Sequence, residues 1–108
     1  MASSTSAADH LHLVTLKCKD RNDAERCLHA LAEYGKPDAL AFGCQSYEFG
    51  LEEGTADTVY LVERWASWRD LDALLQEKVV PALPMYNELL EQPFDPARDT
   101  LRIRLSRP

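Results

Sequence analysis

The sequence contains few cysteines and no long apolar run. Its three cysteines, Cys18, Cys27 and Cys44, are odd in number and none form a Cys-x-x-Cys pair. This pattern argues against a disulfide framework and against a zinc site, and it favours a reducing compartment such as the cytoplasm. No segment approaches the roughly 20 consecutive apolar residues that a transmembrane helix needs. We therefore expect no membrane span.

Basic residues are also scarce, with 12 Lys and Arg against 18 Asp and Glu and a net charge of -6. A surface for nucleic acid or anionic membrane requires clustered cations that displace counterions. Here the cations are scattered, apart from Arg102, Arg104 and Arg107 near the end of the sequence. The composition therefore argues against nucleic-acid and membrane partners.

The length of 108 residues suits one domain with a single core. Residues 1–9, MASSTSAAD, are small and polar, without a basic start or an apolar centre. They predict a disordered N-terminal tail that is neither a signal peptide nor an anchor. We expect residues 10–108 to form the folded domain.

The most informative stretch is a predicted hairpin from Gly43 to Trp68, with an acidic turn between its two strands. The second strand, Thr58 to Trp65, alternates so that one face carries Val59, Leu61, Glu63 and Trp65. The other face also carries large apolar groups, so we expect both faces of this strand to be covered. Glu63 is the exception on its face, because a carboxylate among apolar neighbours needs a partner or a role.

The remaining periodicities predict two more strands, Leu11 to Cys18 and Thr100 to Leu105, and a helix from Asp23 to Tyr34. Asn22 is the expected cap of that helix, and Gly35 and Pro37 are expected to end it. A second helix is predicted to begin at Ser67, with an inner stripe of Leu71, Leu74, Leu75, Lys78 and Val79.

Pro81 and Pro84 are expected to break the second helix, because proline suits a first turn and not an interior. A separate short helix is therefore predicted from about Pro84 to Glu91, with Met85, Leu89 and Leu90 facing inward. In the last strand, Leu101, Ile103 and Leu105 alternate with Arg102 and Arg104, a pattern typical of a strand with one solvated face.

The element order is strand, helix, strand, strand, helix with a short extra helix, and strand. Two β-α-β halves of this kind predict an α+β, ferredoxin-like fold: one four-stranded antiparallel sheet with its helices on one face. The other face would lie bare in a single chain. Apolar residues on both faces of the first and third strands therefore favour a homodimer.

Three segments, GCQSYEF (43–49), VERW (62–65) and RDLDALL (69–75), together with this element order, resemble the antibiotic biosynthesis monooxygenase superfamily of dimeric α+β barrels. The resemblance implies two subunits packed sheet against sheet, each with a cavity between its sheet and helices. It also implies cofactor-independent oxygenation of an aromatic or polyketide-type small molecule in secondary metabolism, with no flavin and no metal. The haem-degrading branch carries a helix histidine and a first-strand asparagine, which this sequence lacks, so haem degradation is not expected.

Cofactor-free oxygenation needs an apolar pocket, a base and donors for the developing charge. The candidate catalytic residues are His12, Glu63 and Trp65. Histidine is the side chain type whose intrinsic pKa is nearest to neutrality, as a general base requires. Glu63 could act as a base or accept a structural hydrogen bond. Trp65 could donate its indole N–H to substrate or to a neighbour in the core.

The candidate substrate-binding residues are Tyr47, Tyr86 and Asn87. Tyr47 and Tyr60 lie on paired strands, and either could reach the cavity while the other faces the dimer. Tyr86 and Asn87 could orient a ligand or be exposed to solvent. No metal site is expected, because His10 and His12 share a strand face but no third ligand is spaced to join them.

Two alternatives remain open. The same fold hosts polyketide cyclases and lyases, which need a His or Tyr acid–base pair and no oxidant; His12 with Tyr47 or Tyr86 could fill that role. A non-catalytic ligand-binding or stress-related dimer is the other alternative. Whether the chain is an enzyme stays open at this point.

Overall fold

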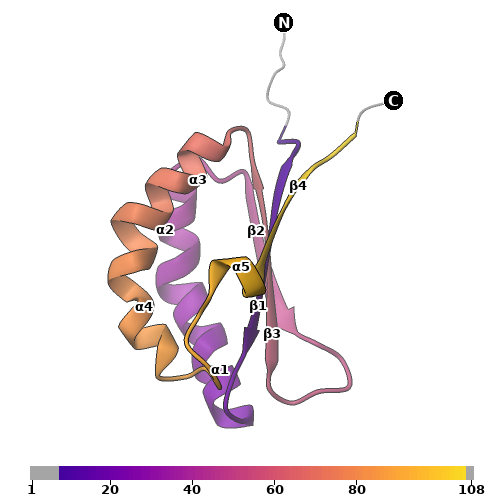
Figure 1. The fold of residues 1–108 in the computed structure, drawn as a ribbon, viewed down its shortest axis with the longest axis vertical. Coiled ribbons are helices and arrows are strands. Elements are labelled where there is room, and N and C mark those ends of the chain that lie inside the picture. Colours follow the sequence, from indigo (N-terminus) through magenta and orange to yellow (C-terminus); the bar gives the residue numbers. More distant parts are fainter. Residues whose placement is uncertain (1–7, 107–108) are drawn as a thin grey trace, which may run out of the picture.

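The computed structural model describes residues 8–106, so all but two residues of the predicted tail 1–9 lie outside the described part. One sheet holds four antiparallel strands in the order β2-β3-β1-β4, and the helices pack against one of its faces (Figure 1). The predicted ferredoxin-like fold is therefore confirmed. The strands are β1 (His10–Lys17), β2 (Ser46–Leu51), β3 (Thr58–Trp65) and β4 (Thr100–Arg104).

The central strands β1 and β3 pair along their whole length, from His10 opposite Trp65 to Lys17 opposite Thr58. Both lie between neighbours on either side, as their apolar patterns predict. The helix-facing side of the sheet forms the core together with the helices. Its buried strand residues include Val14, Leu16, Val59, Leu61 and Trp65.

The first helical region runs without interruption through α1 (Arg21–Ala30), a π-helical segment η2 (Leu31–Gly35) and α2 (Lys36–Ala41). The predicted cap was wrong: Asp20 caps α1, and its Oδ1 accepts from the backbone N–H of Asp23 at 2.8 Å. The predicted end at Gly35 and Pro37 was also wrong. In the π turn, the backbone N–H of Lys36 donates to the carbonyl of Leu31, five residues back. Pro37 then lies in the first turn of α2, where its missing N–H costs no helical hydrogen bond.

The second helical region also contains a π-helical segment: it consists of α3 (Trp68–Leu74), η3 (Leu75–Val79) and α4 (Val80–Asn87). Ser67 caps α3 as predicted, with its Oγ accepting from the N–H of Arg69 at 3.0 Å. The predicted break was wrong, because the π turn places Pro81 at the start of α4 and the helix continues through Pro84.

Residues after α4 return toward the sheet. Leu89 and Leu90 are buried as predicted, whereas Met85, expected to face inward, is 40% exposed. Leu90 bridges to Cys18 just beyond β1. A short helix, α5 (Pro96–Asp99), then leads into β4. No helix in residues 8–106 is long and apolar enough to cross a membrane.

Strand β4 was predicted to have one solvated face, but both of its faces are exposed. Arg102 lies on the helix side, where it pairs with Asp72 at 2.6 Å and lies 5.1 Å from the ring centre of Trp68. Leu101 and Ile103 lie on the opposite face and are exposed. Residues 101–104 are all exposed, so both faces of β4 are solvated, and nothing in the described chain covers the face that carries Leu101 and Ile103.

Gly35 allows the side chain of Tyr47 to approach helix η2. A Cβ at this position would lie 2.4 Å from Tyr47 Oη, and the glycine has an ordinary helical φ of -61°. We therefore expect Gly35→Ala to lower the free energy of unfolding by about 1–3 kcal/mol through overpacking. Denaturant titration measures this change.

Gly50→Ala is the matched control, since a Cβ at Gly50 meets no atom within 4 Å. Its stability should equal or slightly exceed that of the wild type, because alanine restricts the unfolded chain. Equal unfolding free energies for both variants would contradict the close packing of Gly35 against Tyr47.

Candidate active site

Three polar side chains form a row across the helix-facing side of the sheet. The strand register places His12 of β1 opposite Glu63 of β3, and Glu63 opposite Tyr47 of β2. Directly paired residues of antiparallel strands point to the same face. The alternation that buries Val14 and Leu61 therefore also turns this row toward the helices.

His12, Glu63 and Trp65 form a buried His–Glu–Trp cluster. His12 Nδ1 lies 2.8 Å from Glu63 Oε1, and the indole N–H of Trp65 donates to the same oxygen at 2.9 Å. The three residues are 5%, 4% and 0% exposed. A carboxylate accepting both bonds fixes the imidazole with its proton on Nδ1, so that a neutral His12 carries its lone pair on Nε2.

His12 and Glu63 line a cavity of about 110 Å³ between the sheet and the helices. Most of the wall is apolar, and both π-helical segments contribute to it. Tyr34 of η2 and Lys78 of η3 line the cavity and are also exposed to solvent. The mouth of the cavity therefore lies between the two helical regions.

Two of the tyrosines that line the cavity, Tyr47 and Tyr86, have raised pKa values. Burial, with a contribution from Glu63, raises the pKa of Tyr47 well above its usual range. Burial likewise raises the pKa of Tyr86 to about 12, with smaller contributions from Cys27 and Asp38. Both hydroxyls therefore keep their protons at neutral pH and can donate hydrogen bonds to a group in the cavity.

The structure brings together most of the residues singled out from the sequence. Tyr47 and Tyr86 line the cavity beside His12 and Glu63. Trp65 lies behind the wall, and its N–H is already bonded to Glu63, which matches the core alternative for this residue. Asn87 is not part of the wall; its Oδ1 accepts from the backbone N–H of Phe94 at 2.9 Å.

Tyr60, the alternative to Tyr47, faces away from the cavity and donates to Glu52 at 2.7 Å. Phe94, Asp38 and Lys78 are among the lining residues that sequence reasoning did not assign to the site. Lys78 had a signal, as the one charged member of an apolar helical stripe. Phe94 had none, because it lies in a proline-containing loop without periodicity.

No metal centre emerges from the part of the chain that the structure describes, since residues 8–106 contain no group of three potential ligands. His10 bonds Asp9 at 2.8 Å and packs edge-on against Trp68. The cysteines are free and buried. Burial raises the pKa of Cys27 to about 12 and that of Cys44 to about 11, so neither is an activated nucleophile.

The fold and the site define a small α+β protein with an internal cavity and a buried His–Glu–Trp cluster in its wall. No family model matches the sequence. A search of curated proteins likewise finds no match. Solved structures, in contrast, match across nearly the whole chain.

A monooxygenase of Streptomyces coelicolor, solved with the ligand nanaomycin D, is similar at 10% identity and a TM-score of 0.72, over 93% of this chain and 89% of that one. A Chloroflexus aurantiacus protein assigned as an antibiotic biosynthesis monooxygenase is 16% identical, with a TM-score of 0.69 over 92% and 94% of the two chains. A Mycobacterium tuberculosis protein is 21% identical, with a TM-score of 0.67 over 92% and 97%. The chain therefore has the fold of the antibiotic biosynthesis monooxygenases, and the resemblance inferred from sequence is confirmed at the level of fold.

The buried thiols predict that alkaline pH destabilises the protein. Unfolded cysteines lose their protons near pH 8.5, whereas Cys27 and Cys44 hold theirs until about 12 and 11. Between these limits the folded state binds more protons, so the free energy of unfolding falls as pH rises. The expected slope is about 1.4 kcal/mol per pH unit for each thiol.

Denaturant unfolding with reductant at pH 8, 9 and 10 measures this slope. Cys27→Ala should remove one thiol's share of the pH dependence, whatever its effect on stability at pH 7. A wild-type profile that stays flat from pH 8 to 10 would show that these thiols titrate normally in the fold.

Proposed function

We propose that this protein is a cofactor-independent, monooxygenase-like enzyme that acts on an aromatic or polyketide-type small molecule. The observation that carries the proposal is the buried bond between His12 and Glu63 in the wall of a largely apolar cavity. A carboxylate behind a histidine holds the imidazole in one tautomer and stabilises the imidazolium that proton uptake creates. This arrangement suits a general base.

In the proposed reaction, His12 Nε2 takes a proton from an acidic C–H or O–H of the substrate. The substrate anion then transfers electrons to molecular oxygen. For an activated methylene, one oxygen atom ends in the product carbonyl and the other in water, so the substrate itself supplies all four electrons. Glu63, which is hydrogen-bonded to His12 Nδ1, stabilises the imidazolium that this proton transfer creates.

The neighbouring wall supports the anion that this step creates. Tyr47 and Tyr86 remain protonated and can donate to a developing oxyanion. The apolar remainder of the cavity excludes bulk water, which strengthens these hydrogen bonds. Trp65 acts through Glu63, because its N–H holds the carboxylate in place.

The comparisons with solved structures support a monooxygenase-like function. One structural neighbour is a monooxygenase with a bound small organic ligand, and another, from Bacteroides thetaiotaomicron, is described as a possible oxidoreductase, at 17% identity and a TM-score of 0.70 over 92% of this chain and 100% of that one. We place the protein in the cytoplasm, a location that its three free thiols favour.

A non-oxidative cyclase or lyase is the second candidate, supported by the same His12 base with Tyr47 as a neutral acid. Oxygen consumption separates the two reactions. A non-catalytic ligand-binding protein is the third candidate, and it would bind ligands in the cavity without converting them.

Oxygen uptake by metal-stripped protein, over a panel of anthrones, naphthols, phenols and catechols, tests the proposal. His12→Gln should lower kcat by about 10²–10⁴-fold, the usual contribution of a general base. Trp65→Phe should lower kcat less, by about tenfold, because the carboxylate remains but loses one donor.

His29→Gln is the matched control, since His29 also pairs with a glutamate, Glu33, but is 77% exposed at its side chain. It should retain wild-type turnover. Equal rates for the His12 and His29 variants would remove His12 as the base. Product formation without oxygen uptake would favour the cyclase or lyase.

We further propose a homodimer through the uncovered face of the sheet. This face carries apolar residues from three strands, and Leu101 is 62% exposed on it. The strand register places the group together: Leu11, Leu13, Val62, Leu101 and Ile103. A contiguous apolar surface of this kind marks an interaction site, and a second copy offers the complementary surface.

At micromolar protein concentration, Leu101→Arg should convert the dimer into a monomer, because the substitution places a charge in the apolar interface. Sedimentation velocity measures the change. Leu40→Arg is the control, since Leu40 is 47% exposed on α2, in the helical layer. A wild-type protein that sediments as a monomer would contradict the dimer.

A further inference from the structure

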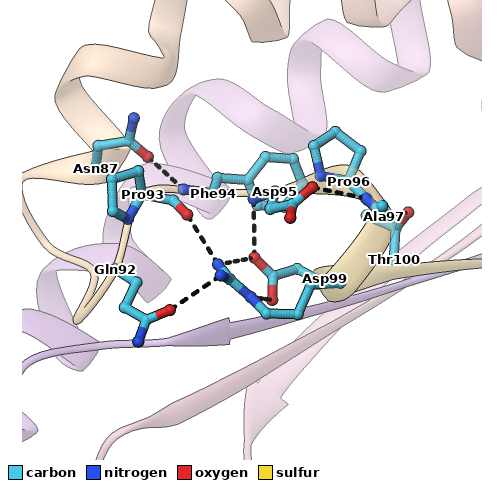
Figure 2. A network of polar contacts seen from close by, with 10 residues as sticks. Asn87, Gln92, Pro93, Phe94, Asp95, Pro96, Ala97, Asp99 and Thr100 are labelled. Carbon is cyan, nitrogen blue, oxygen red and sulfur yellow. Dashed lines mark hydrogen bonds and ion pairs between the residues drawn. The ribbon is translucent and has the colours of Figure 1, made fainter.

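A strap of residues 91–99 closes one side of the cavity after the chain leaves α4. Phe94 is the strap residue that lines the cavity, and it packs against the core while its neighbours are exposed. Figure 2 shows the polar contacts that surround it. The strap lacks regular structure before α5, so these contacts decide where Phe94 lies.

Asn87 fixes the backbone of Phe94 directly. Its Oδ1 accepts from the Phe94 N–H at 2.9 Å, which joins the end of α4 to the middle of the strap (Figure 2). The start of the strap is fixed as well, because the N–H of Glu91 donates to the carbonyl of Lys17 at 2.9 Å. Phe94 is therefore held between a helix and the end of β1.

Arg98 braces the strap from its outer side. Its guanidinium donates to Gln92 Oε1 at 2.9 Å, to the carbonyl of Pro93 at 2.8 Å and to the carboxylate of Asp99 at 2.8 and 2.9 Å. Asp99 in turn accepts from the N–H of Asp95 at 3.0 Å. Pro93 is thus bonded directly to Arg98, and Asp95 is bonded to it through Asp99, so the backbone that carries the Phe94 ring is held on both sides.

The size of the cavity limits the molecules that it can hold. At about 110 Å³ it is smaller than an engineered apolar cavity of roughly 150 Å³ that binds benzene. A single ring therefore fits only with slight adjustment of the wall. A fused polycyclic molecule does not fit while Phe94 stays in place.

We propose that Phe94 determines substrate size, restricting this cavity to phenols or enols of one ring, and that Asn87 is the residue that positions it. The inference rests on the proposed function for the chemical class of the ligand. It narrows that class from aromatic or polyketide-type molecules in general to single-ring ones. Removing the Phe94 ring opens space beside the cavity and admits a second fused ring.

Binding of phenol and 1-naphthol to the full-length, metal-free protein tests the inference by calorimetry, without any need for turnover. The wild type should bind phenol about tenfold or more tightly than 1-naphthol, the discrimination that a filled apolar pocket supplies. Phe94→Ala should shift the ratio by about tenfold or more toward 1-naphthol. Circular dichroism checks that each variant is folded.

Asn87 variants separate positioning from general destabilisation. Asn87→Ala removes the acceptor for the Phe94 N–H and should shift the ratio in the same direction as Phe94→Ala. Asn87→Asp keeps an oxygen in that place and should retain the wild-type ratio. If Phe94→Ala does not fold, the contrast between the two Asn87 variants carries the test.

Phe42→Ala is the matched control, because Phe42 packs against the core but does not line the cavity. It should leave the ratio unchanged. A wild type that binds 1-naphthol as tightly as phenol, a folded Phe94→Ala with an unchanged ratio, or no binding of either probe to wild type and Phe94→Ala would overturn the inference. The proposed function is tested separately by oxygen uptake, and it fails if His12→Gln consumes oxygen as fast as the wild type.

Discussion

The buried carboxylate of Glu63 is the constraint on which the site depends. A charge in an apolar interior is costly unless donors surround it, and removing one partner of such a group costs several kcal/mol. Here His12 and Trp65 both reach Oε1. The pairing of β1 with β3 is thereby tied to one register, because a slip of one residue would turn His12 to the other face. Structure and proposed catalysis use the same hydrogen bond.

The cavity lies beneath the irregular parts of the two helical regions. Each helical region contains one π-helical segment, η2 or η3, and both segments line the cavity. A π turn widens a helix locally and is common at functional sites. The same wide turns accommodate Pro37 and Pro81, so the prolines accompany the feature that shapes the site. Gly35 within η2 gives Tyr47 the room to reach the wall.

Prediction from the sequence succeeded for the strands and for the face on which Glu63 lies, and it failed where helices meet prolines. Strand alternation has a period of two that nothing interrupts, so β3 was predicted from Thr58 to Trp65, as observed. Helix ends were predicted from proline and glycine rules that assume α-helical bonding. A π turn changes the carbonyl to which each backbone N–H donates. No local sequence pattern predicted the two π turns. The role of Asn87 was likewise invisible, because its partner Phe94 lies seven residues away in a loop.

The sequence by itself determined the element order, the grouping of residues on the two faces of each central strand and the presence of a carboxylate that needed partners. These follow from local periodicity and from the cost of burying a charge. Only the tertiary structure decided that His12 and Trp65 are those partners, that Tyr47 joins their row and that Phe94 closes the cavity. Such contacts join residues as far apart as 51 positions along the chain. Their distances depend on strand register and helix packing, which no local pattern specifies.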